Sequence, residues 1–132
     1  MGRLGNIENI SAVKIGNAIV QVELADTVAK RTKGLMFRKS LGENEGMLFI
    51  FPSKGKHVFW MANTYIPLDI IWIGADMKIV HIEENVPPCT ETGKLQAMCR
   101  VYRPDDTAKY VLEVNGGWSE KHKVENGVLV SF

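Results

Sequence analysis

Short apolar runs of strand length dominate the pattern of hydrophobic and polar positions along the chain. From residue 46 onward the runs GMLFIF, HVFWM, LDIIWIG, KIVHIEE, KYVLEV and GVLVSF are each rich in β-branched or aromatic residues. An earlier pair of runs, in AVKIGNAIVQVEL, is separated by Gly16 and Asn17, a dipeptide suited to the positive φ values of a two-residue hairpin turn. Together these runs predict about eight strands.

One stretch has a helical pattern instead. Asp26 is a suitable N-cap, TVAKRTK follows with cations in its last turn, and Gly34 suits the left-handed position after a helix. We therefore predict a short helix within residues 26–34. The runs GMLFIF and IIWI are apolar on both faces, which predicts central strands covered on two sides. The predicted fold class is mainly β: an antiparallel sandwich or a partly closed barrel with one or two short helices.

Length, charge and the N-terminus limit the class of protein. The chain has 132 residues, 45% hydrophobic and 23% charged, so we expect a single domain over residues 1–132. A formal charge of +1 gives no electrostatic footprint for nucleic acid, and no apolar run is long enough to span a bilayer. We expect neither nucleic acid nor a membrane as partner. The segment MGRLGNIENISAVKI lacks the apolar core of a secretory signal, which predicts a cytoplasmic location unless a leader was removed.

The two cysteines lie in an unusually long connection. Cys89 and Cys99 have no CxxC spacing and offer only two of the ligands that a zinc site needs. Two free thiols are the favoured interpretation because cytosolic disulfides are rare, and a disulfide between them is the alternative. The surrounding segment VPPCTETGKLQAMCRVYRPDDTA is longer than ordinary loops, which are usually short unless functional. We predict that residues 88–104 form a mobile flap close to residues 61–69, with the cysteines near enough to oxidise together.

Candidate chemistry begins with Asp69, a carboxylate that directly precedes the apolar run IIWI. An ionised carboxylate is costly there unless it has hydrogen-bond partners. We expect Asp69 to be largely buried, with Asn63 or Thr64 of the preceding loop among its donors. In the structural interpretation it stabilises its own loop. In the functional interpretation it is a catalytic or binding carboxylate.

Glu113, in YVLEVNGGW, is a second acid among apolar neighbours. If its strand lies beside that of Asp69, the two carboxyls could form an acid/base pair with separated pKa values. Strand alternation alone favours a Glu113 that faces solvent or pairs with Arg31 or Arg38. His57 is another candidate partner of Asp69. The candidate catalytic residues of a hydrolase are thus Asp69, Glu113 and His57.

Metal and nucleotide chemistry have weaker support. The three histidines are scattered without metal-ligand spacing, and GxSxG, P-loop, HExxH and GxGxxG motifs are absent from the sequence. Soft Cu(I) ligands are conceivable among Met36, Met47 and Met61, together with His57 and the cysteines. Methionines beside leucine and tryptophan are more often core residues. We expect no cofactor and no metal site, with a copper or redox protein as an alternative.

Four segments in this order, KGLMFRKSL, EGMLFIFP, FWMANTYIPLDIIWI and YVLEVNGGW, resemble an uncharacterised family named domain of unknown function 192. The resemblance covers about residues 31–128, with Trp72 in place of the expected phenylalanine. It implies a mostly β domain without a settled activity, found in archaea and in bacteria, where many members carry export signals.

The favoured hypothesis for function is a non-catalytic β module that binds a small molecule or serves as an accessory to another protein. Its cleft would lie near the FWMANTYIPLD loop and combine apolar walls with a few polar groups. The candidate binding residues are Trp60, Asn63, Thr64 and Asp69. We also expect Trp60 and Trp72 to bury most of their rings, one of them as a wall of the cleft. A hydrolase that uses Asp69 is the first alternative.

Overall fold

A computed structural model describes residues 9–132; residues 1–8, part of the segment that predicted the location, lie outside the described residues. In the described part the elements are β1 (Ala12–Ile15), β2 (Ala18–Ala25), α1 (Val28–Lys33), β3 (Glu45–Gly55), β4 (Phe59–Trp60), β5 (Leu68–Ile73), β6 (Ile79–Val86), the 3-10 helix η2 (Gly93–Met98), β7 (Val101–Tyr102), β8 (Ala108–Asn115), α2 (Trp118–Lys121) and β9 (Val130–Ser131). None of the helices in residues 9–132 has the length and apolar content needed to cross a bilayer.

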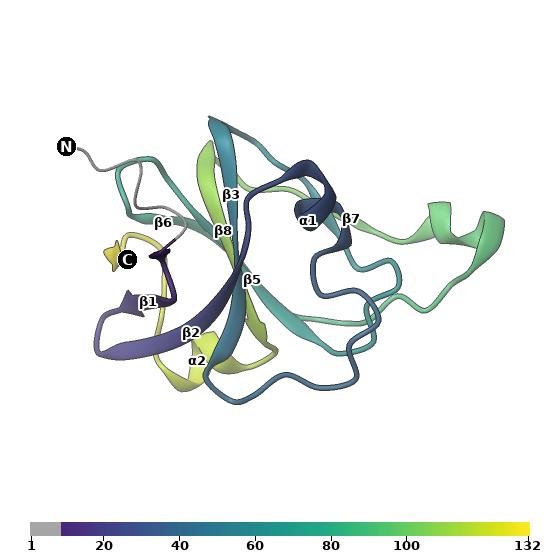
Figure 1. Ribbon diagram of the computed structural model, residues 1–132, viewed down its shortest axis with the longest axis horizontal. Coiled ribbons are helices and arrows are strands. Elements are labelled where there is room, and N and C mark those ends of the chain that lie inside the picture. The colour runs from purple at the N-terminus through teal and green to yellow at the C-terminus, as the bar shows by residue number, and fades with distance from the viewer. Residues whose placement is uncertain (1–8) are drawn as a thin grey trace.

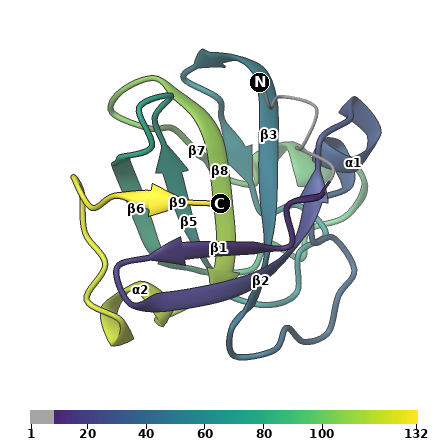
Figure 2. The ribbon, with the colours of Figure 1, turned by 60° about the vertical axis from the view of Figure 1, so that its left-hand side comes forward.

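One curled sheet of seven strands organises the molecule, in the order β6-β5-β8-β3-β2-β1-β9 (Figure 1). Figure 2 shows β1 and β2 crossing in front of β3 and β8, so the sheet folds back over one of its own faces. Strands β4 and β7 form a separate antiparallel pair. The pairs are antiparallel except for β2 with β3, which are parallel because the chain crosses over through α1. The predicted mainly β, partly closed architecture is confirmed.

The local predictions for the hairpin and the helix are confirmed, with one correction. Gly16 has a φ of 58° in the turn between β1 and β2. The N-cap of α1 is Thr27, whose Oγ1 accepts the N–H of Lys30 at 3.1 Å, and not Asp26. Asp26 instead lies 3.7 Å from the Lys30 ammonium, one helical turn away.

Both faces of the central strands are buried, as predicted. The inner face of the curl holds one apolar cluster, built around Leu48, Ile71 and Leu112. The outer face holds a second cluster that includes Phe49, Ile70 and Trp72. Every residue of β5 is buried, because this strand has β6 and β8 as neighbours and a cluster on each side. The register of β5 with β8 therefore decides whether Asp69 and Glu113 lie on the inner or the outer face of the sheet.

The two tryptophans differ from each other. Trp72 is fully buried and its Nε1 donates a hydrogen bond to the carbonyl of His57 at 2.8 Å. Trp60 is 41% exposed, so its burial is far less complete than that of Trp72. The two-residue strand β4 pairs with β7 alone, outside the seven-stranded sheet.

The long connection runs beside residues 61–64, as predicted. The backbone of Cys89 forms isolated β-bridges with Ala62 and Thr64, and the Gln96 side chain donates a hydrogen bond to the Asn63 side chain at 3.0 Å. The part of the connection that carries η2 projects from the body of the molecule (Figure 1), and Gln96 of η2 makes the contact to Asn63. Cys89 and Cys99 form a disulfide with a Cα–Cα distance of 5.9 Å, so the interpretation as free thiols is wrong. The mobility of this segment stays a prediction.

Removal of the disulfide tests its contribution to stability. We expect the double variant Cys89→Ser, Cys99→Ser to lose roughly 2 to 3 kcal/mol of unfolding free energy, because the crosslink closes a loop of about ten residues. Urea denaturation of both proteins, with and without dithiothreitol, measures this loss. The reductant should destabilise only the wild type, since the double variant has no disulfide to break. Equal stability of the two proteins under oxidising conditions would contradict the expectation.

Candidate functional site

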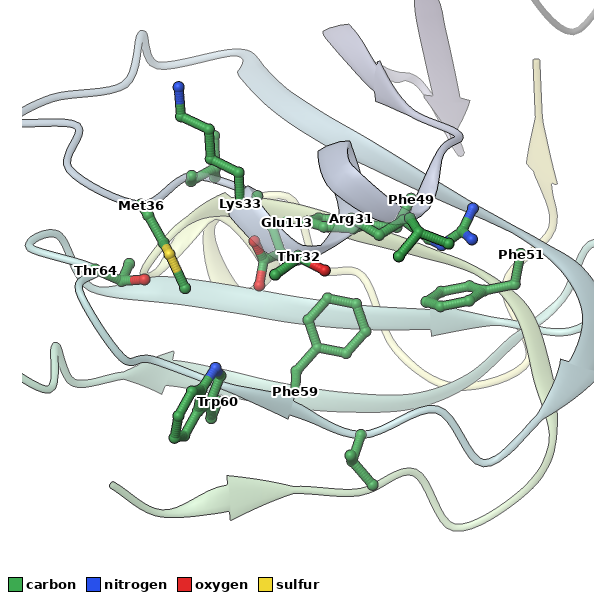
Figure 3. A pocket seen from close by; sticks show the side chains of 14 residues that line it. Arg31, Thr32, Lys33, Met36, Phe49, Phe51, Phe59, Trp60, Thr64 and Glu113 are labelled. Carbon is green, nitrogen blue, oxygen red and sulfur yellow. The ribbon is translucent and has the colours of Figure 1, made fainter. Parts of the chain in front are cut away.

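A cleft of about 370 Å³ lies between α1 and the strands β3 and β4 (Figure 3). Its volume falls within the range of roughly 300 to 1,000 Å³ that is common for small-molecule sites. Helix α1 and the turn after it contribute Val28, Arg31, Thr32, Lys33, Gly34, Leu35 and Met36. Strand β3 contributes Phe49 and Phe51, and β8 contributes Glu113. The segment through β4 contributes Val58, Phe59, Trp60 and Thr64. The walls therefore combine four aromatic rings and other apolar side chains with five polar or charged ones.

Glu113 is the buried acid of this cleft. It is 4% exposed, and its neighbours across the sheet are Met47 on β3 and Ile70 on β5. These apolar surroundings remove the carboxyl from water and raise its pKa from 4.5 to about 8. No residue in 9–132 makes a hydrogen bond to this carboxyl. At neutral pH Glu113 is therefore a neutral acid that can donate a hydrogen bond to a bound molecule.

The predicted acid/base pair of Asp69 and Glu113 is wrong. Strands β5 and β8 are neighbours, as the pair requires, but Asp69 is opposite Val114 whereas Glu113 is opposite Ile70. Because successive residues of a strand point to opposite faces, the two carboxyls lie on opposite sides of the sheet. The alternatives for Glu113 are wrong as well. It does not face solvent, and Arg38 pairs with Glu23.

Asp69 is fully buried and bound by backbone N–H groups. Its Oδ1 accepts from Asn85 at 2.7 Å and from Gly117 at 3.0 Å, and its Oδ2 accepts from Ser119 at 2.7 Å. The predicted burial is confirmed, but the predicted donors in residues 62–66 are wrong. The actual donors come from the end of β6 and from the turn into α2. Asp69 therefore joins three segments, and it does not line the cleft.

The other candidate residues divide between the cleft and its support. Trp60 and Thr64 line the cleft, as expected for binding residues. Asn63 does not: it has a φ of 56°, and its carbonyl accepts the N–H of Phe37 at 2.8 Å. Asn63 therefore connects the turn after α1 to the loop after β4, which holds two sides of the cleft together. The predicted flap is also absent from the lining, which includes no residue of 88–104.

His57 packs on β3, away from the predicted partner. Its ring stacks on Phe51 with centroids 3.7 Å apart, and its Nε2 lies 3.0 Å from the carbonyl of Ser53. Within residues 9–132 it makes no hydrogen bond to Asp69. The candidate catalytic residues Asp69, Glu113 and His57 therefore do not converge on one point.

The sulfur groups of the copper alternative have different surroundings, and Met36 lines the cleft. Met47 and Met61 are buried in the outer cluster, and both cysteine sulfurs belong to the disulfide. In the part of the chain that the structure describes, no group of three or more His, Cys, Asp or Glu side chains is arranged to hold a metal ion.

The wall that α1 supplies was missed by the sequence analysis. In the sequence, Arg31 and Lys33 fit cations that complement the helix dipole, and Arg31 is also a possible partner of Glu113. A signal was present, because this segment adjoins KGLMFRKSL, one of the segments that carry the family resemblance. Only the crossover from β2 to β3 shows that the helix lies over Glu113.

A comparison with known families identifies the family that the four sequence segments resemble. The sequence profile of domain of unknown function 192, described as Uncharacterized ACR, matches residues 11–132. The chain belongs to this family. The matched region begins about twenty residues before the region of resemblance, since it includes the hairpin of β1 and β2.

Two UPF0127 proteins and a solved structure of a protein of unknown function are similar to this chain. A UPF0127 protein of Thermococcus gammatolerans is 30% identical over 116 residues, 84% of this chain and 65% of that protein. One from Thermococcus kodakarensis is 29% identical over 117 residues, 85% of this chain and 64% of that protein. The chain thus spans less than two thirds of the length of these two relatives. A crystal structure of a protein of unknown function from Novosphingobium aromaticivorans is 36% identical with a TM-score of 0.81, covering 92% of this chain and 84% of that one.

Proposed function

We propose that this DUF192 chain is a binding module for a small molecule that sits in the cleft beneath α1. The observation that carries the proposal is Glu113, a buried carboxyl at the cleft with no hydrogen-bond partner among residues 9–132. Within residues 9–132 the fully buried side-chain atoms without a partner are Ser119 Oγ and His122 Nε2, so the Glu113 oxygens reach the open cleft, where a bound molecule can pair with them. The aromatic walls would supply the apolar contact area of such a site.

Binding is better supported than catalysis. A hydrolytic site needs at least two groups that act together on one accessible point. Among the residues that line the cleft, Glu113 is the one carboxyl, and the lining includes no histidine. Asp69, the catalytic candidate of the hydrolase hypothesis, is on the other face of the sheet. We therefore keep the favoured hypothesis of a non-catalytic module and move its main polar group from Asp69 to Glu113.

A fragment screen tests this proposal. We expect hits from a chemically diverse library to shift the indole N–H signal of Trp60 in NMR spectra of the labelled protein. The variant Thr32→Trp places a large ring at an exposed position of the cleft wall, so it should weaken those hits by at least about tenfold through steric exclusion.

The matched control is Ala29→Trp, an exposed substitution on the same helix at a position that does not line this cleft. It should leave the affinities within about twofold of the wild type, a change that is small beside the tenfold loss. Hits that bind Thr32→Trp as well as they bind the wild type, or hits that leave the Trp60 signal unmoved, would overturn the proposed function.

A further inference from the structure

Arg31 is a cationic group of the cleft that the proposed function leaves unused. Its Nη1 donates to the carbonyl of Ile50 at 2.9 Å, and its guanidinium carbon lies 5.3 Å from the centre of the Phe51 ring. These contacts hold the planar group in one place on the cleft wall. Arginine has five N–H donors, so several remain after the Ile50 carbonyl is satisfied. Within residues 9–132 Arg31 forms no ion pair with a carboxylate.

The helix dipole does not account for this geometry. Cations are favoured in the last turn of a helix, and Lys30 fits that explanation because it is exposed and lies near Asp26. Arg31 is half-buried, and its guanidinium contacts β3 at Ile50 and Phe51 instead. An arginine fixed in this way is preorganised for a planar anion, since little side-chain freedom is lost on binding.

The charge of the cleft favours an anion over a cation. Arg31 and Lys33 both line it, and Lys33 also lines the adjacent hollow beside Arg38. Glu113 is the one acid in the lining, and its burial raises its pKa and favours the neutral form. A positive field in a cleft with partly apolar walls raises the local concentration of anions and repels amines.

The labelled side chains give an order along the cleft. Figure 3 places Phe51 toward one end, Met36 and Thr64 toward the other, and Phe59 and Glu113 between them. Because the Arg31 guanidinium lies over Phe51, the fixed cation and the neutral acid are separated along an aromatic wall. A molecule that fits has a charged end at Arg31 and an apolar body that runs along the cleft past Phe59 and Glu113.

We propose that the ligand of this cleft is a small organic carboxylate with an apolar or aromatic body. This inference rests on the proposed function and adds the ligand class. The carboxylate would bind the free donors of Arg31, whose fork geometry suits two carboxylate oxygens. The body would lie along Phe59 and Trp60, and Lys33 would add positive charge at the rim.

Three compounds with one skeleton test the inference: phenylpropionate, phenylpropionamide and phenylpropylamine, titrated at pH 7 and followed by NMR. We expect the carboxylate to bind wild type at least about tenfold more tightly than the amide, and the amine to bind most weakly, because charge-assisted bonds to arginine are about twice as strong as neutral ones. Arg31→Gln should lower the affinity for the carboxylate to that for the amide. It should leave the affinity for the amide within about twofold of the wild-type value.

Two further variants separate local from general effects. Arg31→Lys keeps the charge and loses the fork, so it should give an intermediate affinity for the carboxylate. Lys30→Gln removes one charge from an exposed position of α1 that does not line the cleft, and it should change carboxylate binding less than about threefold.

The outcomes distinguish the two proposals. Wild type that binds the amide or the amine as tightly as the carboxylate overturns the carboxylate inference and leaves the proposed function in place. The carboxylate inference is also overturned if Lys30→Gln lowers the affinity for the carboxylate as much as Arg31→Gln does. In that case the effect comes from the general electrostatic field and not from the Arg31 guanidinium. Failure of all three compounds to bind also overturns the inference, while the fragment screen with Thr32→Trp decides the proposed function independently.

Discussion

The variant Glu113→Gln is expected to be more stable than the wild type at alkaline pH and equally stable at acidic pH. Burial raises the pKa of Glu113 from 4.5 to about 8. Between these values the unfolded chain has lost a proton that the folded chain still holds, so the stability of the wild type falls as the pH rises through this window. Below pH 4.5 both states are protonated and the penalty is absent. Glutamine is neutral throughout, so the variant carries no such penalty.

The expected difference at pH 9 is on the order of 4 kcal/mol, since each pKa unit corresponds to about 1.4 kcal/mol. Urea denaturation of both proteins at pH 5, 7 and 9 gives the difference in unfolding free energy directly, and other titrating groups cancel in it. Glu125→Gln, at an exposed position, is the matched control and should follow the wild type at every pH. Parallel stability curves for the wild type and Glu113→Gln would refute the assignment of Glu113 as a buried neutral acid.

The stability cost of Glu113 bears on its proposed role. A glutamate held neutral in an apolar site destabilises the protein at physiological pH relative to a simple hydrophobic residue. Groups with strongly shifted pKa values are concentrated at functional sites, where the cost is tolerated for the chemistry it provides. For Glu113 that chemistry would be hydrogen-bond donation to a ligand that Arg31 orients.

Much of the fold follows from patterns that are local in sequence. The turn at Gly16 and Asn17 depends on the positive φ that Gly16 adopts, and the burial of GMLFIF and IIWI depends on apolar side chains at consecutive positions. The short helix could be placed for the same reason. Its N-cap was misplaced by one residue because Asp26 and Thr27 are both good capping residues, and the backbone at Thr27 decides between them.

The candidate site could be predicted only in part, because it depends on register and crossover. The sequence marked Asp69 and Glu113 as unusual acids, and both are buried. A shift of one residue in the pairing of β5 with β8 would put them on the same face, and no local pattern sets that register. The role of Arg31 depends on where the parallel crossover carries α1, which is a property of the whole sheet.

The variant Asp69→Asn is expected to lose about 3 kcal/mol of unfolding free energy, because hydrogen bonds to a charged acceptor are strong and an unpaired buried donor is costly. An asparagine oxygen can still accept from Asn85 and Gly117, but its NH₂ group would then face the N–H of Ser119. Thermal and urea denaturation measure the loss. The control is Asp76→Asn, an exposed turn residue that accepts a single N–H from Lys78 and should cost little.

Ligand binding separates this structural role of Asp69 from a functional one. Asp69 lies on the opposite face of the sheet from Glu113, so folded Asp69→Asn should bind the hits of the fragment screen with affinities within about twofold of the wild type. Glu113→Gln has the reverse profile. It should retain or gain stability, and it should lower the affinity for those hits that need a stronger hydrogen-bond donor than an amide. An unchanged melting temperature for Asp69→Asn, together with lost binding, would reverse the two assignments and return Asp69 to the site.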